Sequence, residues 1–338
     1  MEKHLLVTIS EEKSALYGVR FVGRFFTNAE NLRLTLFASA PQAPDVMGTG
    51  MGYEGKLRAE EYDDLARRRS QEAVDRARNL LRERGFPRES LEGKIASRRF
   101  SKVMDIVQEA EAGMYDAVVL GRRGLGRLEE ALEQSVSQGL VQESMTIPLW
   151  ICRMPEINRK NVLACVDGSV PAYQAVDHAS FMLADEPGHD LTLLKVNAAG
   201  EDAENETVFA KCLEICKDNG LDASRVSTRV IHDTSAAQGI LAEVERGRYA
   251  AVAVGHSGRS RRLMSRFLFG SVSMTLLRQL MGAALWVCRK SEEPGRALPS
   301  PDPTHQGARP PGPHFLGVGR ASRQSNVGRS CLQIVAYS

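Results

Sequence analysis

The sequence predicts an α/β protein made of two tandem copies of one domain, each with a doubly wound, five-stranded parallel sheet. Three observations support this prediction. The segment Leu149–Arg153 (LWICR) returns as Leu285–Arg289 (LWVCR), although the chain contains only two tryptophans. Each copy alternates apolar strand-length runs with amphipathic helix-length runs, which is typical of parallel α/β sheets. A length of 338 residues is enough for two such domains.

The repeat extends through both copies. Three pairs of segments align: His4–Ser10 with Asn161–Asp167, Gly113–Gly124 with Gly247–Gly258, and Ser135–Arg153 with Ser271–Arg289. The offset between copies is 157 residues at the first pair and 134 at the second, so the first copy carries about 23 extra residues. We place them in residues 38–58, whose Gly and Pro content predicts a long loop. The third pair shows that the second copy has gained two residues between Gly258 and Ser271.

Each copy reads strand, helix, strand, helix, strand, helix, strand, helix, strand. In the second copy the predicted strands are Val162–Val166, Leu191–Val196, Val226–Ile231, Ala250–Val254 and Leu285–Cys288. After the first strand of each copy, apolar residues follow the i, i+4, i+7 spacing of one helix face, with Ser14 and Ser169 as expected N-caps. We therefore place the first domain at residues 1–153 and the second at residues 159–290.

Composition excludes several classes of function. The net charge is +2, and the tail at residues 291–338 supplies it, so the body has no basic excess that favours nucleic acid. The tail holds half of the 14 prolines and lacks periodicity, which predicts disorder. The apolar run Leu5–Ile9 is too short for a signal peptide, and no run approaches the roughly 18 apolar residues of a membrane span. We expect a cytoplasmic protein.

The six cysteines show no CxxC pair and no spacing typical of a metal site. Cys212 and Cys216 are four residues apart on a predicted helix, but two thiols alone make a poor metal site. We expect every cysteine except Cys331 to be a small buried hydrophobic residue. No metal site is predicted.

Two segments with chemical content follow predicted strands, at the sheet edge where parallel sheets bind ligands. Val166–Ser169 (VDGS) presents a carboxylate, and the spacing alone favours helix capping by Asp167 over ligand binding. Gly255–Ser271 is a glycine-containing loop that leads into the last helix. Glycines let a backbone approach a ligand closely, and a helix N-terminus suits a phosphate.

On these motifs each copy resembles a universal stress protein domain, a family whose nucleotide-binding members show Gly-x2-Gly-x9-Gly-Ser/Thr after the fourth strand. The resemblance covers almost all of Met1–Lys290. It implies a Rossmann-like fold that binds ATP in some members, with Mg²⁺ as a companion of the nucleotide. It also implies that the two final strands, Leu149–Arg153 and Leu285–Arg289, pair within the chain as a pseudo-dimer. Further association into a homodimer stays open.

The resemblance also implies a nucleotide site in the second copy. Its adenine, ribose and phosphate contacts would come from Cys165, Val166, Asp167, Val196, Val254, Gly255, Ser257, Gly258, Gly270, Ser271, Val272 and Ser273. Eleven residues, rather than the family's nine, separate Gly258 from Gly270. The arginines Arg259, Arg261, Arg262 and Arg266 in this loop either neutralise phosphates or face a partner.

A weaker site is predicted in the first copy at Gly121, Gly124 and Ser135. Here Gln134 replaces the family's glycine, and Ser10 stands at the position of Asp167. We expect this site to be weak or empty, with Arg122, Arg123 and Arg127 solvated.

The leading functional prediction is a stress-response regulator that binds ATP and changes its interaction with an unidentified protein partner. One alternative is a nucleotide-independent interaction module of the same family. Another is a slow ATPase, although no P-loop motif is present. His256 is the candidate general base for that activity, and a solvated loop histidine is the simpler interpretation.

Overall fold

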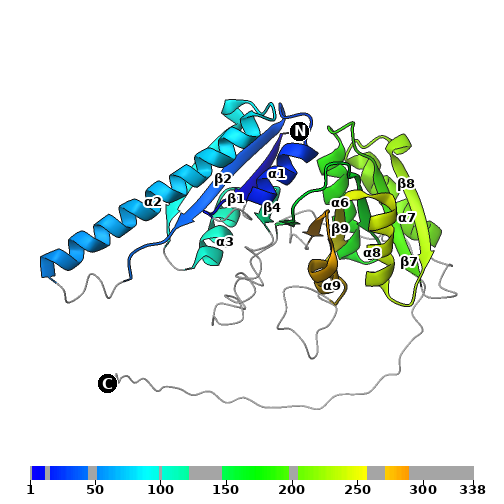
Figure 1. Ribbon diagram of the computed structural model, residues 1–338. Helices are drawn as coiled ribbons and strands as arrows, with labels where there is room; N and C mark the ends of the chain where they lie inside the picture. The colour runs from blue at the N-terminus through cyan, green and yellow to red at the C-terminus, as the bar shows by residue number, and fades with distance from the viewer. Residues whose placement is uncertain are drawn as a thin grey trace, which may run out of the picture. The chain divides into compact units, whose positions relative to one another are not determined.

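The computed structural model describes residues 2–11, 16–44, 52–98, 101–121, 147–197, 205–256 and 271–288. The first copy contains β1 (Lys3–Thr8), α1 (Leu16–Phe25), β2 (Leu32–Ala40), α2 (Gly52–Arg82), a 3₁₀ turn (Arg88–Ser90), β3 (Leu91–Ser97), α3 (Lys102–Ala112), β4 (Ala117–Gly121) and β5 (Leu149–Cys152). The second contains β6 (Lys160–Cys165), α6 (Val170–Leu183), β7 (Leu191–Asn197), α7 (Asn205–Asp218), a 3₁₀ turn (Ala223–Arg225), β8 (Val226–His232), α8 (Ala236–Gly247), β9 (Tyr249–Gly255), α9 (Ser271–Gln279) and β10 (Ala284–Cys288). Figure 1 shows the first copy in blue to cyan and the second in green to brown.

The ten described strands form one sheet in the order β3-β2-β1-β4-β5-β10-β9-β6-β7-β8. Within each copy the strands run parallel, and the same order is repeated. The two copies meet at β5 and β10, which pair antiparallel. The predicted α/β class, the tandem organisation and the pairing of the final strands are therefore confirmed.

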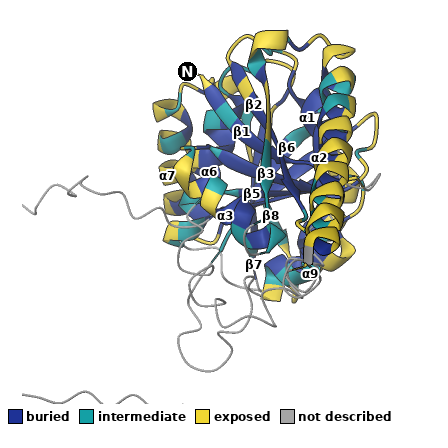
Figure 2. Cartoon of the chain, turned by 90° about the vertical axis from the view of Figure 1, so that its left-hand side faces the viewer, coloured by how far each residue is buried: buried dark blue, intermediate teal, exposed yellow. Residues whose placement is uncertain are grey.

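Side chains that alternate between the two faces of the sheet divide the buried core into two layers. In β1, Leu5 and Val7 pack into one buried cluster with α1, α2, α6 and α7, whereas Leu6 packs into a second cluster with α3, α8 and α9. Successive strand side chains point to opposite faces, so helices must cover both faces of a sheet this apolar. Figure 2 shows the buried strands flanked by helices with exposed outer faces.

The prediction of a loop over residues 38–58 is wrong at both ends. Residues 38–40 continue β2, and residues 52–58 belong to α2, which is 31 residues long. Figure 1 shows α2 running beside β2 and reaching beyond it. Its C-terminal half buries Ala73, Ala77 and Leu81 at helical spacing, while the N-terminal half is mostly exposed, with Tyr53 at 78%. The insertion thus lengthens a helix whose first turns are too polar to reveal a core-facing stripe.

Among the predicted local features, Ser169 is the N-cap of α6, where its Oγ accepts a hydrogen bond from the Ala172 N–H at 3.4 Å. Ser14 and the tail at 291–338 lie outside the described residues. The cysteines Cys152, Cys212, Cys216 and Cys288 are buried as predicted, whereas Cys165 is half-buried. Burial raises the pKa of Cys212 to about 11 and that of Cys216 to about 12, so both stay protonated thiols at neutral pH.

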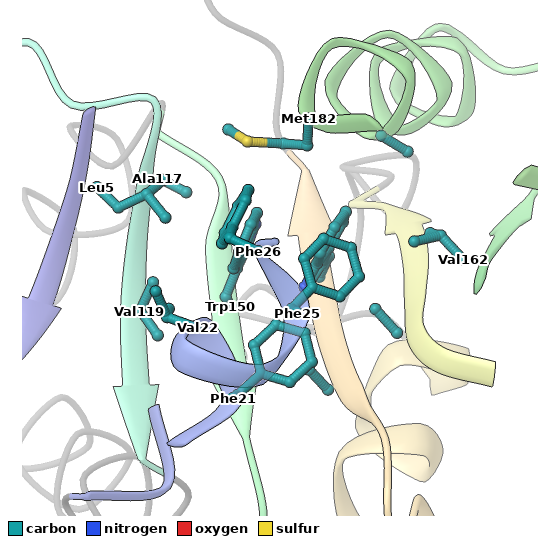
Figure 3. Packing of buried hydrophobic residues seen from close by; sticks show 14 of the residues in the cluster. Leu5, Phe21, Val22, Phe25, Phe26, Ala117, Val119, Trp150, Val162 and Met182 are labelled. Atoms are coloured by element: carbon teal, nitrogen blue, oxygen red, sulfur yellow. The ribbon is translucent and has the colours of Figure 1, made fainter. Parts of the chain in front are cut away.

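Both tryptophans lie in the seam between the copies. Trp150 stands directly opposite Trp286 in the β5–β10 pair, and the two indoles stack with their centroids 4.0 Å apart. Both side chains are fully buried. Figure 3 shows Trp150 beside Phe21 and Phe25 of α1 and Phe26, the residue that follows α1. One aromatic core is therefore shared by the two copies.

Trp150 and Trp286 occupy equivalent positions in the two copies, but their hydrogen bonds differ because of one buried histidine. The Trp150 Nε1–H donates to His178 Nε2 at 2.9 Å, whereas Trp286 Nε1 is buried without an acceptor among the described residues. At the offset of 157 residues, the position of His178 is taken by Phe21 in the first copy. A phenyl ring has no acceptor nitrogen, so only one indole is satisfied.

Polar contacts join the copies beside this core. The Glu186 carboxylate, only 1% exposed, accepts from the Thr27 N–H at 2.8 Å, the Thr27 hydroxyl at 2.7 Å and the Asn28 N–H at 3.2 Å. His189 Nδ1 accepts from the Asn161 N–H, so its Nε2–H donates to the Phe25 carbonyl at 2.7 Å. The ammonium of Lys3 pairs with Asp185 at 2.6 Å. The loop after α6 therefore holds the C-terminal end of α1.

Replacing Glu186 with glutamine is expected to lower the free energy of unfolding by about 1.5–3 kcal/mol, the range for hydrogen bonds to a charged group. The amide keeps the size of the side chain but carries no charge, and its NH₂ group cannot accept from Thr27 or Asn28. Urea unfolding measures the loss. Glu206→Gln, on the exposed face of α7, is the matched control. Equal midpoints for the two variants would contradict the role of Glu186 as a clamp.

Candidate functional site

A cavity of about 170 Å³ lies in the second copy at the carboxyl ends of β6, β7 and β9. The first turns of α6, α8 and α9 complete its walls. This is the edge at which open parallel sheets place their ligands. The cavity forms at this edge because the chain leaves β6 and β9 there and then starts the helices α6 and α9.

Nine predicted site residues line this one cavity: Cys165, Val166, Asp167, Val196, Val254, Gly255, Ser271, Val272 and Ser273. They come from four separate parts of the chain, so the fold brings them together. Ser257, Gly258 and Gly270 lie outside the described residues. So do Gly124, Ser135 and Gln134 of the first copy and the arginines of both loops, namely Arg122, Arg123, Arg127, Arg259, Arg261, Arg262 and Arg266.

The walls also include residues that the sequence analysis did not assign to the site: Ser169, Ala172, Leu194, Ala236 and Ile240. Leu194 lies two residues before Val196 and so shares its face of β7, a signal that was present in the strand pattern. Ala236 and Ile240 share one face of α8 by their spacing of four residues. Nothing in the sequence alone indicates that this face meets the end of β7.

Asp167 presents a free carboxylate oxygen at the rim of the cavity. Its Oδ1 accepts from the Ser169 N–H at 2.9 Å, and Oδ2 has no partner among the described residues. The helix cap is Ser169, so the interpretation of Asp167 as the N-cap of α6 is wrong. Gly168 allows this turn because its φ of +79° lies in the left-handed region. The exposed carboxylate is thus available to accept a hydrogen bond from a ligand.

Gly255 places the end of β9 against the first turn of α6. A Cβ at this position would lie 2.3–2.5 Å from backbone atoms of Pro171 and Ala172. Only glycine permits this approach. His256 follows, half-buried, and its N–H donates to the Cys288 carbonyl at 2.8 Å, which ties this edge to β10.

The electrostatics of the cavity favour an anionic ligand near the helix ends. Three helices begin at its walls, and a helix N-terminus carries unpaired N–H groups and about half a positive charge. Burial, followed by the nearby Asp167 carboxylate, raises the pKa of the Cys165 thiol well above its usual range. Cys165 therefore lines the cavity as a neutral thiol rather than a nucleophile.

The first copy differs at the matching edge. Ser10 is half-buried at the position of Asp167. Ser39 and Asp105 correspond to Val196 and Gly239 in the second copy, and the Ser39 hydroxyl donates to the Asp105 carboxylate at 2.6 Å. In the second copy, a Cβ on Gly239 would lie 3.3 Å from the Val196 side chain. A buried polar pair thus replaces an apolar contact, a difference that the motif comparison missed.

No helix among the described residues is long and apolar enough to cross a membrane. Within the same residues, no group of three or more His, Cys, Asp or Glu side chains is arranged to hold a metal ion.

Comparisons with known proteins agree with the repeat. The model of the universal stress protein family matches residues 1–153 and 158–281. A universal stress protein from Archaeoglobus fulgidus is similar in structure, with a TM-score of 0.58, 17% identity, and coverage of 85% of this chain and 98% of that one. A functionally unknown protein from Pseudomonas aeruginosa is also similar, with a TM-score of 0.45, 15% identity, and coverage of 85% and 92%.

A universal stress protein solved in complex with cAMP matches 38% of this chain and 95% of its own, with a TM-score of 0.32 and 16% identity. Among curated proteins, none matches this sequence significantly. At these identities, the similarity to the Archaeoglobus protein shows the fold.

Proposed function

Because the chain belongs to the universal stress protein family over both of its copies, we propose that the second copy binds an adenine nucleotide at the carboxyl ends of β6, β7 and β9. In this proposal, occupancy of the site changes how the protein binds a protein partner. The observation that carries it is the convergence of nine residues, assigned by motif, on one cavity.

The walls suit the parts of a nucleotide in different places. Val196, Val254 and Leu194 offer apolar surface for a base, and Asp167 Oδ2 offers an acceptor for a ribose hydroxyl. The start of α9, with the hydroxyls of Ser271 and Ser273, offers donors for phosphate oxygens. At about 170 Å³ the cavity is smaller than the roughly 300–1,000 Å³ of pockets that bury a drug-sized ligand. It would therefore enclose the base or ribose, with the phosphates nearer the surface.

We assign the first copy a weaker role in nucleotide binding or none. Ser10 has no charge with which to accept strongly from a ribose hydroxyl. The Ser39–Asp105 pair also places a hydroxyl at the position of the apolar wall residue Val196, with the buried Asp105 carboxylate hydrogen-bonded to it. A buried carboxylate would repel the electron-rich edge of a base and the phosphates alike.

Titration calorimetry with ATP and Mg²⁺ tests the proposal. We expect one site per chain. Asp167→Asn is expected to weaken binding about 10- to 150-fold, since a hydrogen bond to a charged acceptor contributes about 1.5–3 kcal/mol. Asp218→Asn, an exposed aspartate on α7, is the matched control and should bind like the wild type. Gly258→Val, in the glycine motif, is expected to abolish binding.

The alternatives predict different results. No heat of binding with folded protein would reject the nucleotide proposal and favour an interaction module that acts without a nucleotide. Binding of two nucleotides per chain would contradict the assignment of a weak first site. Steady release of phosphate that Asp167→Asn abolishes would favour a slow ATPase.

A further inference from the structure

A second, larger cavity lies at the opposite edge of the sheet, where the two copies meet. Its volume is about 600 Å³, within the roughly 300–1,000 Å³ of small-molecule sites. It is bounded by the C-terminal end of α1, the segment that links β5 to β6, the loop after α6 and the amino ends of β6 and β9. It therefore shares no residue with the cavity at the carboxyl ends.

The floor of this seam cavity is aromatic. Phe21, Phe25 and Phe26 line it, and all three belong to the buried core shared with the tryptophans. Figure 3 shows these rings gathered beside Trp150. His189 stacks on Phe25 with ring centroids 4.3 Å apart, and both of its ring nitrogens are hydrogen-bonded. An apolar body placed here would rest on rigid aromatic surface.

The rim carries more positive than negative charge. The lining cations are Arg24, Arg84, Arg159 and Lys160, and the lining carboxylate is that of Glu156. Glu156 and Glu245 both pair with Arg159, at 3.1 Å and 2.7 Å. Arg24 donates to the Pro155 carbonyl at 2.6 Å, and the described residues hold no carboxylate paired with Arg24, Arg84 or Lys160. Three positive charges thus surround the cavity without a neutralising acid.

Arg159 adds a buried donor. Its side chain is 2% exposed, and its Nε–H has no acceptor among the described residues. A buried N–H left without a partner costs about 1–3 kcal/mol, so a hydrogen-bond acceptor that reached this group would be stabilised by it.

The repeat shows why the charge is uncompensated on this side of the seam. At the offset of 157 residues, Lys160 corresponds to Lys3 and Asn28 to Asp185. Lys3 is buried and pairs with Asp185 at 2.6 Å across the seam. The matching position opposite Lys160 is a neutral asparagine, and Lys160 is exposed at the cavity instead. One end of the seam is closed by an ion pair, and the other end keeps its cation and an open cavity.

We propose that the seam cavity binds a small organic anion, in which an aromatic or aliphatic body rests on the phenylalanines and a carboxylate, sulfonate or phosphate faces Arg24, Arg84 and Lys160. Because its walls come from both copies, such a ligand would also tie the copies together. The site is separate from the nucleotide site, so either can exist without the other.

A matched pair of fluorescent probes tests the proposal on the full chain. The anion 8-anilinonaphthalene-1-sulfonate and the uncharged N-phenyl-1-naphthylamine share their aromatic body and differ in the sulfonate. We expect the anion to bind once per chain and at least tenfold more tightly than the neutral probe. The double variant Arg84→Gln with Lys160→Gln should weaken the anion at least tenfold, while Lys217→Gln, an exposed lysine on α7, should leave it unchanged.

A steric variant locates the binding without removing charge. Gly188 lines the cavity, and a Cβ there would meet no atom within 4 Å, so Gly188→Trp should fold and block the anion. Equal anion affinity in the wild type and the double variant, equal affinity for the two probes, or unweakened anion binding by a folded Gly188→Trp variant would each overturn the proposal. Thermal melts of each variant establish that it is folded.

Discussion

Replacing Trp150 with alanine is expected to destabilise both copies of the domain, by about 3–5 kcal/mol in total, the range for large-to-small changes of a buried aromatic residue. The physical reason is that the indole belongs to both cores. It stacks on Trp286 at 4.0 Å and on Phe26 at 6.0 Å, and it donates to His178 of α6. Its removal therefore leaves a void bordered by elements from each copy.

Hydrogen exchange measured by mass spectrometry localises the effect, since amides report the stability of the segment that contains them. In Trp150→Ala we expect faster exchange in β4 and β5 and also in β9 and β10. Leu91→Ala is the control, because Leu91 is buried in β3, the edge strand of the first copy, and β2, β1 and β4 lie between β3 and the seam. It should accelerate exchange in the first copy more than in the second. Wild-type protection of β9 and β10 in Trp150→Ala would show that the cores are independent.

Acidification is expected to destabilise the protein through His178. Burial lowers the pKa of His178 from 6.5 to about 3, and its Nε2 must be unprotonated to accept from Trp150. In the unfolded chain the imidazole takes up a proton near pH 6.5, but in the folded chain it does so only near pH 3. Stability is therefore fully present above pH 6.5 and falls as the pH falls through this window.

The slope corresponds to about 1.4 kcal/mol per pH unit, so the loss between pH 6.5 and pH 3 is on the order of 3–5 kcal/mol. Urea unfolding at a series of pH values measures it. His178→Gln keeps a hydrogen-bond acceptor but cannot titrate, so it should flatten the dependence. A smaller slope should persist, since burial also lowers the pKa of His189 and of His4. An unchanged slope in His178→Gln would contradict the assignment to His178.

The repeat made most of the fold predictable. Two alignable copies require the same order of strands, and the apolar runs placed the strands of the second copy to within two residues at each end. The residues 38–58 were predicted wrongly because Gly and Pro dominate the local signal there. The first turns of α2 are mostly exposed, so their sequence shows no apolar stripe. They are helical because they extend a helix whose C-terminal half packs on the sheet.

The cavity at the carboxyl ends was only partly predictable. Residues directly after strands, such as Asp167 and Gly255, follow from the motif because strand ends lie at one edge of a parallel sheet. Ala236 and Ile240 do not, because the packing angle of α8 decides which of its faces meets β7. The seam cavity was not predicted at all, since it depends on which side chains face one another across the two copies.

The sequence by itself determined that the chain is a duplicated α/β domain, and the family resemblance carried by its motifs predicted that the final strands pair. These properties follow from periodicity and from matched motifs, which are local. Only the tertiary structure decided the asymmetry of the seam: Lys3 meets Asp185 while Lys160 remains exposed, and Trp150 finds His178 while Trp286 finds no acceptor in the described part of the chain. Each of these contacts joins residues that are far apart in the chain, and its energy depends on distance and burial, which a linear sequence does not specify.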